Sequence, residues 1–425
     1  MRVRSGARYP RPRRTDRLSK AAAERHQLDH SETASAVASL YDRAIDIVAK
    51  LRARGDVADE AGGGTVRRSP RFPITRAAEL VGRTGAAIRE AEKDGRLPGV
   101  PRTQTGRRIG YTLTEVNAMR GVFGTRPWRE PTDPIAAIAV QNFKGGVGKS
   151  TVSVHLAQYL AIRGYRVCLI DCDSQGSSTT MLGYIPDLDI AEDDTLYPFI
   201  RNAEMTSLAY AVRETHWDGL YLIPANLRLY SAEYELAARI ARSDPMLLNR
   251  VGEGIASIAE HFDVVILDPP PALGTVSLSV MRAANALLIP IPPTVVDFAS
   301  TTSFLAMLHE SMGVLQERGL PIDLRWIRFL ATRADEQKSM QRELLQMMRS
   351  LFGENMLRAV LRDSAEIDNA SARMMSVYEL DQPVTSRETY QRCMTYLNAV
   401  NAEIETQIRL TWPSHTARLR VEGVL

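Results

Sequence analysis

Apolar and polar residues alternate along the chain in blocks that predict a parallel sheet flanked by helices. Short apolar runs at 135–140, 166–170, 263–267, 286–289 and 326–330 are typical of buried parallel strands. Longer stretches with helical periodicity lie between them. Residues 151–163, for example, carry Val152, Leu156 and Leu160 on one face and end at Gly164. This order predicts an α/β fold with a mostly parallel sheet over residues 131–412.

A separate helical pattern precedes this region, at residues 31–54. Its apolar stripe consists of Val37, Leu40, Ala44, Ile47 or Val48, and Leu51. Such a stripe needs a partner, which is either a second copy of the chain or the rest of the same domain. Residues 55–70 include three consecutive glycines and are expected to be a linker.

Residues 71–130 show the spacing of a helix-turn-helix. Two short helical segments, 75–82 and 85–94, are joined by a tight turn at Arg83-Thr84. The stretch 102–111 then reads as a hairpin wing, and the whole resembles the winged helix-turn-helix of MerR-type regulators. The predicted DNA contacts are Thr84, Arg89 and Lys93 in the major groove and Arg107 and Arg108 on the flanking backbone. The alternative is a small helical subdomain that binds no DNA.

The strongest chemical signal is a glycine-rich loop that follows the first strand, Phe-Lys-Gly-Gly-Val-Gly-Lys-Ser-Thr at 143–151. Its backbone N–H groups and the following helix N-terminus favour phosphate. Lys149 is expected at the β- and γ-phosphates of a nucleotide, and the Ser150 hydroxyl at Mg²⁺. The predicted nucleotide-binding residues here are Lys144, Gly145, Gly146, Val147, Gly148, Lys149, Ser150 and Thr151.

Aspartates follow two of the predicted strands, at the sheet edge where ligands of open α/β folds bind. Asp171 and Asp173 come after the second strand, and Asp268 comes after 263–267. We expect Asp268 and Asp171 to contribute to a Mg²⁺ site, partly through water. Asp173 lies further out and is the better candidate for orienting an attacking water.

These residues resemble the deviant Walker A ATPases of the ParA/MinD group, over about residues 134–410. Lys144 matches the signature lysine, which in that family reaches across a dimer to the partner's nucleotide. Asp171, Asp173 and Gln175 match the switch I pattern, with Ser174 in place of the usual proline. The resemblance also implies that Pro292, Thr332 and Arg333 line the adenine pocket.

Within that group the chain is most similar to the RepA partition proteins of modules that encode replication and partition together. The resemblance implies an ATP- and Mg²⁺-dependent homodimer that binds DNA, with hydrolysis stimulated by a centromere-binding ParB- or RepB-like protein. It also implies repression of its own operon through the helix-turn-helix and a cytoplasmic, nucleoid-associated protein. For non-specific DNA contacts we select Arg358 and Arg362.

Charge and composition agree with a DNA-binding role. The net charge of +3 combines a basic segment 1–130, with 27 Lys and Arg against 15 Asp and Glu, and an acidic remainder. Residues 1–30 are expected to be a disordered basic tail that either contacts DNA or only aids solubility.

Two rival functions remain open at this point. One is a transcription regulator that uses ATP as a ligand without a segregation role, and the other is a MinD-like positioning ATPase. Residues 413–425 are expected to be a short tail without the basic amphipathic face of a membrane-binding helix. Three cysteines without metal-ligand spacing disfavour a metal- or electron-carrier ATPase.

Overall fold

The computed structural model describes residues 30–53, 56–58, 65–67, 70–99, 101, 106, 108–242, 245–380 and 382–425. The strands are β1 (Asp56–Ala58), β2 (Thr65–Arg67), β3 (Ala136–Val140), β4 (Val167–Asp171), β5 (Arg213–Glu214), β6 (Leu220–Ile223), β7 (Val264–Asp268), β8 (Ala286–Ile291) and β9 (Trp326–Ala331). The helices before the sheet are α2 (His30–Ala53), α3 (Ile74–Val81), α4 (Gly85–Lys93) and α5 (Leu113–Phe123). Those between and after its strands are α6 (Lys149–Arg163), α7 (Ser177–Met181), α8 (Pro186–Asp189), α9 (Tyr197–Arg201), α10 (Leu229–Ala241), α11 (Arg250–Ile258), α12 (Thr275–Ala283), α13 (Val295–Glu317), α14 (Ser339–Phe352), α15 (Ala365–Ser371), α16 (Arg387–Leu410) and α17 (Thr416–Val421).

The centre of the α/β region is a seven-stranded sheet in the order β5-β6-β4-β7-β3-β8-β9. Every pairing is parallel except that of the short edge strand β5 with β6. The predicted α/β fold with a mostly parallel sheet is therefore confirmed. The predicted strands are all present, while β5 and β6 are additional to them.

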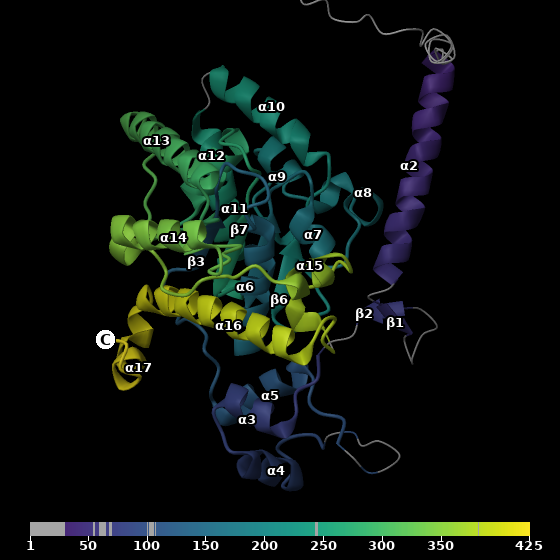
Figure 1. Ribbon diagram of the computed structural model, residues 1–425, viewed down its shortest axis with the longest axis vertical. Coiled ribbons are helices and arrows are strands. Elements are labelled where there is room, and N and C mark those ends of the chain that lie inside the picture. The colour runs from purple at the N-terminus through teal and green to yellow at the C-terminus, as the bar shows by residue number, and fades with distance from the viewer. Residues whose placement is uncertain are drawn as a thin grey trace, which may run out of the picture. The chain divides into compact units, whose positions relative to one another are not determined.

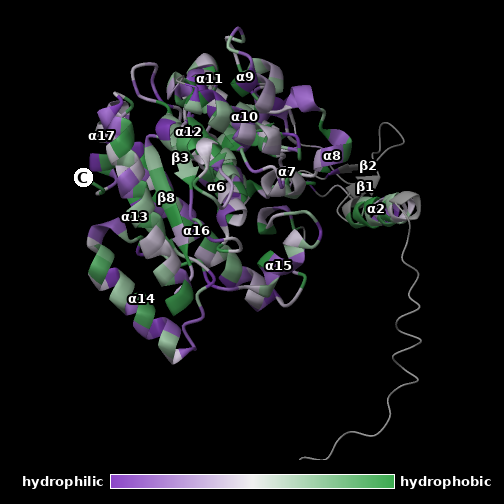
Figure 2. Ribbon diagram, turned by 90° about the horizontal axis from the view of Figure 1, so that it is seen from above, coloured by the Kyte–Doolittle hydropathy of each residue, from purple (hydrophilic) through white to green (hydrophobic). Residues whose placement is uncertain are grey.

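Both faces of the sheet are buried. Successive residues of a strand point to opposite sides, and every residue of β3, β4 and β7 is buried. In β3, Ile138 and Val140 belong to a core that includes α6 and α16, whereas Ala137 and Ala139 belong to a second core beneath α10–α14. Figure 1 shows α16 lying across the α6 side of the sheet. In Figure 2 the hydrophobic colour runs along β8, as expected for a strand that is buried on both faces.

The α3–α5 region packs as one small unit against the α/β region that contains the seven-stranded sheet. Gly82 ends α3 in a left-handed conformation, and Thr84 caps α4, so the predicted helix-turn-helix segments are both helical. The buried Arg120 guanidinium on α5 donates to the carbonyls of Leu80 and Ile162. This side chain joins the first short helix to the end of α6.

Two segments differ from the sequence prediction, and a third lies almost entirely outside the described residues. Residues 55–70, predicted as a linker, contain the short strands β1 and β2, which pair antiparallel and were not predicted. Residues 413–425 include α17, and Ser414 donates to Asp133, so this segment is more structured than the expected tail. The predicted basic tail lies outside the described residues except for its last residue, His30.

Helix α2 forms where the apolar stripe predicted it. Val37, Leu40 and Ile47 are 58–60% exposed along this helix. No helix in the described part of the chain is both long and apolar enough to cross a membrane.

Candidate functional site

The glycine-rich loop connects the central strand β3 to α6. Gly146 and Gly148 have φ values of 76° and 95°, which residues with a side chain rarely adopt. Helix α6 begins directly after Gly148, at Lys149. The loop therefore presents its backbone beside a helix N-terminus, the arrangement that favours bound phosphate.

Lys149 lies in the field of two carboxylates. Its side chain is buried, and its Nζ donates to the Lys144 carbonyl at 3.1 Å. Burial lowers the pKa of Lys149, and the negative charges of Asp268 and Asp173 partly oppose that shift. The loop lysine and the two aspartates, which are distant in sequence, thus share one site.

Asp268 ends β7 directly opposite Asp171, the last residue of β4. One Asp268 oxygen, Oδ2, accepts a hydrogen bond from the Ser178 hydroxyl at 2.7 Å. The other oxygen, Oδ1, is buried and has no hydrogen-bond partner. Burial raises the pKa of Asp268 to about 6, although hydrogen bonds from Ser178 and Ser150 oppose the shift.

This donor set fits Mg²⁺. Asp268 has one buried oxygen without a hydrogen-bond partner, and the Ser150 hydroxyl lies close to the same carboxylate; carboxylate and hydroxyl oxygens are hard donors of the kind that Mg²⁺ prefers. The described residues contain no cluster of three or more His, Cys, Asp and Glu side chains placed to bind a metal.

Asp171 has different partners from those we expected. Its Oδ2 accepts hydrogen bonds from the Thr179 backbone N–H (2.8 Å) and hydroxyl (2.7 Å), and its Oδ1 accepts from the Asp173 N–H. Both oxygens are engaged in holding α7 and the preceding loop, and the contribution of Asp171 to a Mg²⁺ site, partly through water, stays a prediction. Asp173 is only half-buried and accepts from the Gln175 N–H at 3.0 Å.

The Lys144 side chain is paired within its own chain. Its Nζ lies 2.5 Å from Asp297 Oδ1, in the first turn of α13. Thr294 caps the same turn, since its hydroxyl accepts from the Asp297 N–H. Sequence reasoning missed Asp297, although a threonine followed three residues later by an acid is a helix-start pattern.

A cavity of about 100 Å³ lies beside the loop. Two of the three predicted adenine-pocket residues line it: Thr332 donates to the Val147 carbonyl, and Arg333 donates to the Gly146 carbonyl. Pro292 is buried and does not line the cavity. Lining residues that the sequence analysis missed are Leu361, Asp363, Ser364, Ile367, Asp368 and Ser371. Ser364 caps α15, so a capping pattern marked this segment as a helix start.

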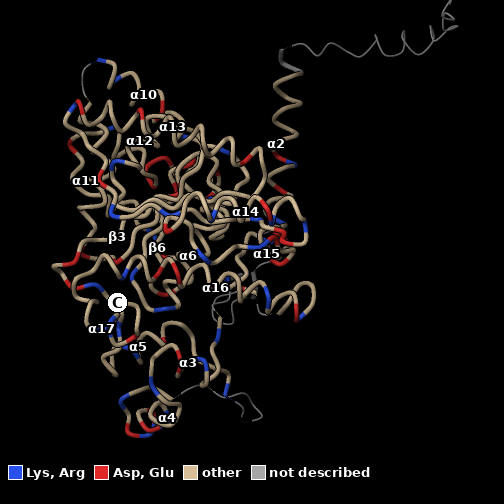
Figure 3. The backbone as a smooth tube through the Cα atoms, turned by 60° about the vertical axis from the view of Figure 1, so that its left-hand side comes forward, with Lys and Arg blue, Asp and Glu red and all other residues tan. Residues whose placement is uncertain are grey.

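Some of the predicted DNA-contacting side chains of the small unit are exposed to solvent, whereas others make hydrogen bonds or ion pairs within the chain. Arg89 and Lys93 are exposed on α4, where Figure 3 shows charges of both signs. The Thr84 hydroxyl accepts from the Ala87 N–H and so caps the helix. Arg108 forms an ion pair with the buried Glu92 carboxylate at 2.7 Å and also donates to Tyr111. This pairing corrects the expectation of a free wing-tip arginine, and Arg107 lies outside the described residues.

The two arginines selected on the α/β region also differ. Arg358 is exposed, and no ion pair of its guanidinium is present among the described residues. Arg362 pairs with Glu336 at 2.9 Å and lies over the Tyr396 ring. Arg358 is therefore the freer of the two for phosphate contact.

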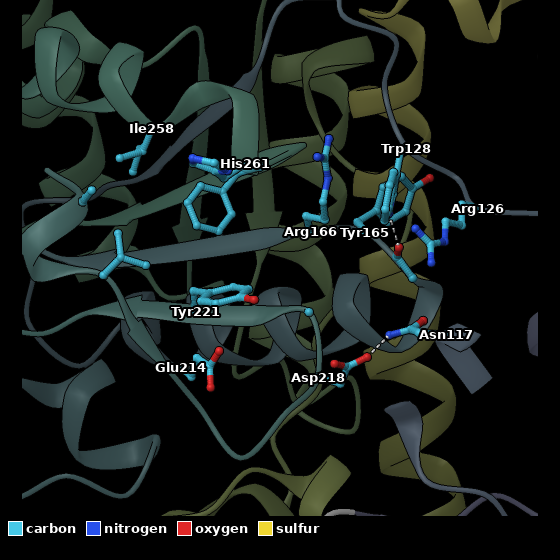
Figure 4. A pocket seen from close by; sticks show the side chains of 15 residues that line it. Asn117, Arg126, Trp128, Tyr165, Arg166, Glu214, Asp218, Tyr221, Ile258 and His261 are labelled. Carbon is cyan, nitrogen blue, oxygen red and sulfur yellow. Dashed lines mark hydrogen bonds between the residues drawn. The ribbon is translucent and has the colours of Figure 1, made fainter. Parts of the chain in front are cut away.

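A cavity of about 680 Å³ lies at the amino ends of β4, β6 and β7, whereas the glycine-rich loop follows the carboxyl end of β3. Figure 4 shows side chains that line this cavity. The Trp128 ring is stacked between the guanidinium groups of Arg126 and Arg166, at 4.3 and 4.4 Å from its centre. Asn117 of α5 donates to Asp218 at 2.6 Å across this region. The cavity thus lies between α5 of the small unit and the sheet region, away from the glycine-rich loop.

Comparison with known proteins adds family evidence. Residues 135–318 match a family model described as an AAA domain. The chain is 33% identical over 353 residues to a Rhizobium rhizogenes protein with the provisional name replication protein A, covering 80% of this chain and 87% of the relative. It is 37% identical over 318 residues to protein SopA of Escherichia coli K12, covering 73% and 80%. The fold also matches a solved structure described as "Partition Protein", with a TM-score of 0.60 at 19% identity, over 88% of this chain and 98% of that one.

Proposed function

The chain belongs to the ParA-type partition ATPases, and we propose that it is the ATPase of a DNA-partition module that binds ATP and Mg²⁺ as a homodimer. The observation that carries this proposal is the meeting of Lys149, Asp173 and Asp268 at the end of the glycine-rich loop. Such a constellation serves phosphoryl transfer, which depends on positioning and electrostatic stabilisation. In cells, we expect the protein on the nucleoid.

In this proposal each residue of the site has a separate task. Lys149 neutralises charge on the β- and γ-phosphates, and Gly145–Thr151 provides N–H donors around them. Thr332 and Arg333 border the base. Ser150 and Asp268 would hold Mg²⁺, which supplies neutralisation of the charge that develops on the phosphates. Asp173 orients the attacking water, while Asp171 fixes the loop that carries Asp173.

DNA and protein partners act at other surfaces. Arg89 and Lys93 on α4 contact operator DNA, and the protein thereby represses its own operon. Arg358 contributes to non-specific binding by the ATP-bound dimer. A centromere-binding ParB- or RepB-like protein stimulates hydrolysis.

Nucleotide binding and sedimentation of three lysine variants test the core of the proposal. Lys149→Ala should abolish ATP binding, since no other described cation is buried at the loop. Lys144→Ala should bind ATP but fail to form the ATP-dependent dimer. Lys338→Ala is the control, because this exposed lysine pairs with Asp335, does not line the cavity beside the loop and should change neither property. A Lys149→Ala protein with normal ATP affinity would refute the assignment.

Hydrolysis provides the second test. Asp173→Ala should bind ATP and dimerise, yet lose about 10²-fold or more in turnover, as expected when a water-positioning carboxylate is removed. The measurement is phosphate release with DNA and the partner protein present. Full stimulated turnover in this variant would remove Asp173 from the mechanism.

A further inference from the structure

One arginine joins the β1–β2 pair to the ATPase body. Arg67, the last residue of β2, donates from Nη1 to the Met181 carbonyl at 3.0 Å. The same Nη1 lies 3.7 Å from the Glu379 carboxylate. The side chains of Arg67 and Glu379 are only 8% and 1% exposed, so this is an interior contact. Neither the glycine-rich loop nor the helix-turn-helix accounts for it.

The Met181 carbonyl matters because of the helix to which it belongs. Met181 is the last residue of α7, a helix of five residues. The Ser178 hydroxyl of this helix donates to Asp268, and the Thr179 backbone N–H and hydroxyl donate to Asp171. A displacement of α7 would therefore move hydrogen bonds to both strand-end aspartates at once.

Glu379 connects the same arginine to the helix that follows the glycine-rich loop. Its carboxylate accepts from Gln158 Nε2 of α6 at 2.8 Å and from the Ser376 N–H at 3.1 Å. His216 Nε2 lies 3.0 Å from it. A buried carboxylate with this many donors is held in one position. Arg67 consequently has a fixed anchor on one side and the end of α7 on the other.

We propose that Arg67 is a positioning residue for the nucleotide site, acting through α7 on Asp268 and Asp171. The inference rests on the proposed ATPase function for its catalytic consequence, whereas the effect on α7 follows from the contacts alone. Among the described elements, the β1–β2 pair is the next after α2, which ends at Ala53. Arg67 thus connects that part of the chain to the loop that carries Asp173.

Two Arg67 variants and one control test this role. Arg67→Ala removes both contacts, whereas Arg67→Lys keeps the charge facing Glu379 but cannot reproduce the planar guanidinium. Arg163→Ala is the control, because Arg163, at the end of α6, likewise pairs with a buried carboxylate, Glu405, at 3.2 Å. The Arg163–Glu405 pair joins α6 to α16 and has no hydrogen bond to α7.

Amide hydrogen exchange of residues 177–181 is measured first, in full-length protein without nucleotide. Arg67→Ala should exchange faster there, Arg67→Lys should be intermediate, and the control should match the wild type. Steady-state hydrolysis follows. In Arg67→Ala, kcat should fall roughly ten- to a hundredfold with KM for ATP changed less than twofold, since misplaced groups cost rate more than binding.

The two measurements separate the inference from the proposed function. Unchanged exchange at α7 in Arg67→Ala overturns the positioning role whatever the activity. Faster exchange with an unchanged kcat overturns its catalytic part. A wild-type protein without any ATP turnover refutes the proposed function, and the exchange result then decides the contact to α7 independently.

Discussion

Lys144 has a partner within its own chain, and this bears directly on its proposed role in a dimer. The ammonium group contacts Asp297 at 2.5 Å, and the lysine side chain is 38% exposed. Solvent screens the lysine end of this pair, although the Asp297 side chain is only 11% exposed, so the pair contributes on the order of 1 kcal/mol. Lys144 can therefore leave Asp297 for a phosphate of a neighbouring nucleotide at a free-energy cost of that order.

Asp297→Asn should strengthen the ATP-dependent dimer two- to fivefold. The substitution keeps the side-chain volume and removes the charge that competes for Lys144, which corresponds to a gain of up to about 1 kcal/mol. Sedimentation velocity over a protein concentration series with bound ATP measures the change. A weaker dimer in this variant would instead mean that Asp297 aims Lys144 toward the partner.

Several residues of the site could be predicted from the sequence, and others could not, for a physical reason. Lys149, Ser150 and the loop glycines belong to one continuous motif whose spacing follows from phosphate geometry. The partners Ser178 and Asp268 are 90 positions apart, and Lys144 and Asp297 are 153 apart. Such pairs depend on strand order, which local periodicity does not encode.

Helix α6 contains a histidine that couples stability to pH. His155 is fully buried, its Nδ1 lies 2.7 Å from the Thr151 carbonyl, and its Nε2 accepts from the Val377 N–H. Burial lowers the pKa of His155 to about 4. The neutral form has a partner at each ring nitrogen, whereas a protonated Nε2 would face a donor.

The free energy of unfolding should therefore fall as the pH decreases from about 6.5 to about 4. In this window the unfolded chain binds a proton at residue 155 that the folded chain does not, so the full loss is about 3 kcal/mol below pH 4. Urea denaturation of wild type and His155→Gln across this range measures it. The comparison with His155→Gln is needed because the raised pKa values of Asp268 and Asp171 make the folded protein more stable as the pH falls, which is opposite to the effect of His155. Parallel curves for the two proteins would contradict the prediction.

At the same scale, α4 should carry sequence recognition. Arg89 is exposed on this helix, and a base contact is worth about 1–3 kcal/mol. Arg89→Ala should reduce the affinity ratio of operator to random DNA accordingly. Arg76→Ala is a suitable control, because Arg76 is an exposed arginine of α3 paired with Glu79. Equal loss for both DNAs in an affinity titration would make Arg89 a phosphate contact.

For the molecule as a whole, the sheet and the helix-turn-helix were predictable because their signals are local and periodic. The β3, β4 and β7 runs are wholly buried, as their apolar composition indicated. The β1–β2 pair was missed, because three-residue strands beside a glycine run have too few positions to show alternation. The attachment of this pair through Arg67 likewise depends on residues more than 100 positions away.

The salt dependence of DNA affinity can show which of two arginines, Arg358 or Arg362, contacts DNA phosphates in the dimer. Each phosphate that a protein neutralises adds about 0.9 to the slope of log affinity against log salt on duplex DNA. Arg358 is exposed, whereas the Arg362 charge is already balanced by Glu336. Arg358→Ala should therefore lower the slope for random DNA by about two in the ATP-bound dimer, one phosphate contact from each subunit. Arg362→Ala should leave the slope unchanged. Fluorescence anisotropy from 50 to 200 mM salt distinguishes them, and the opposite result would show that the dimer breaks the Arg362–Glu336 pair to contact DNA.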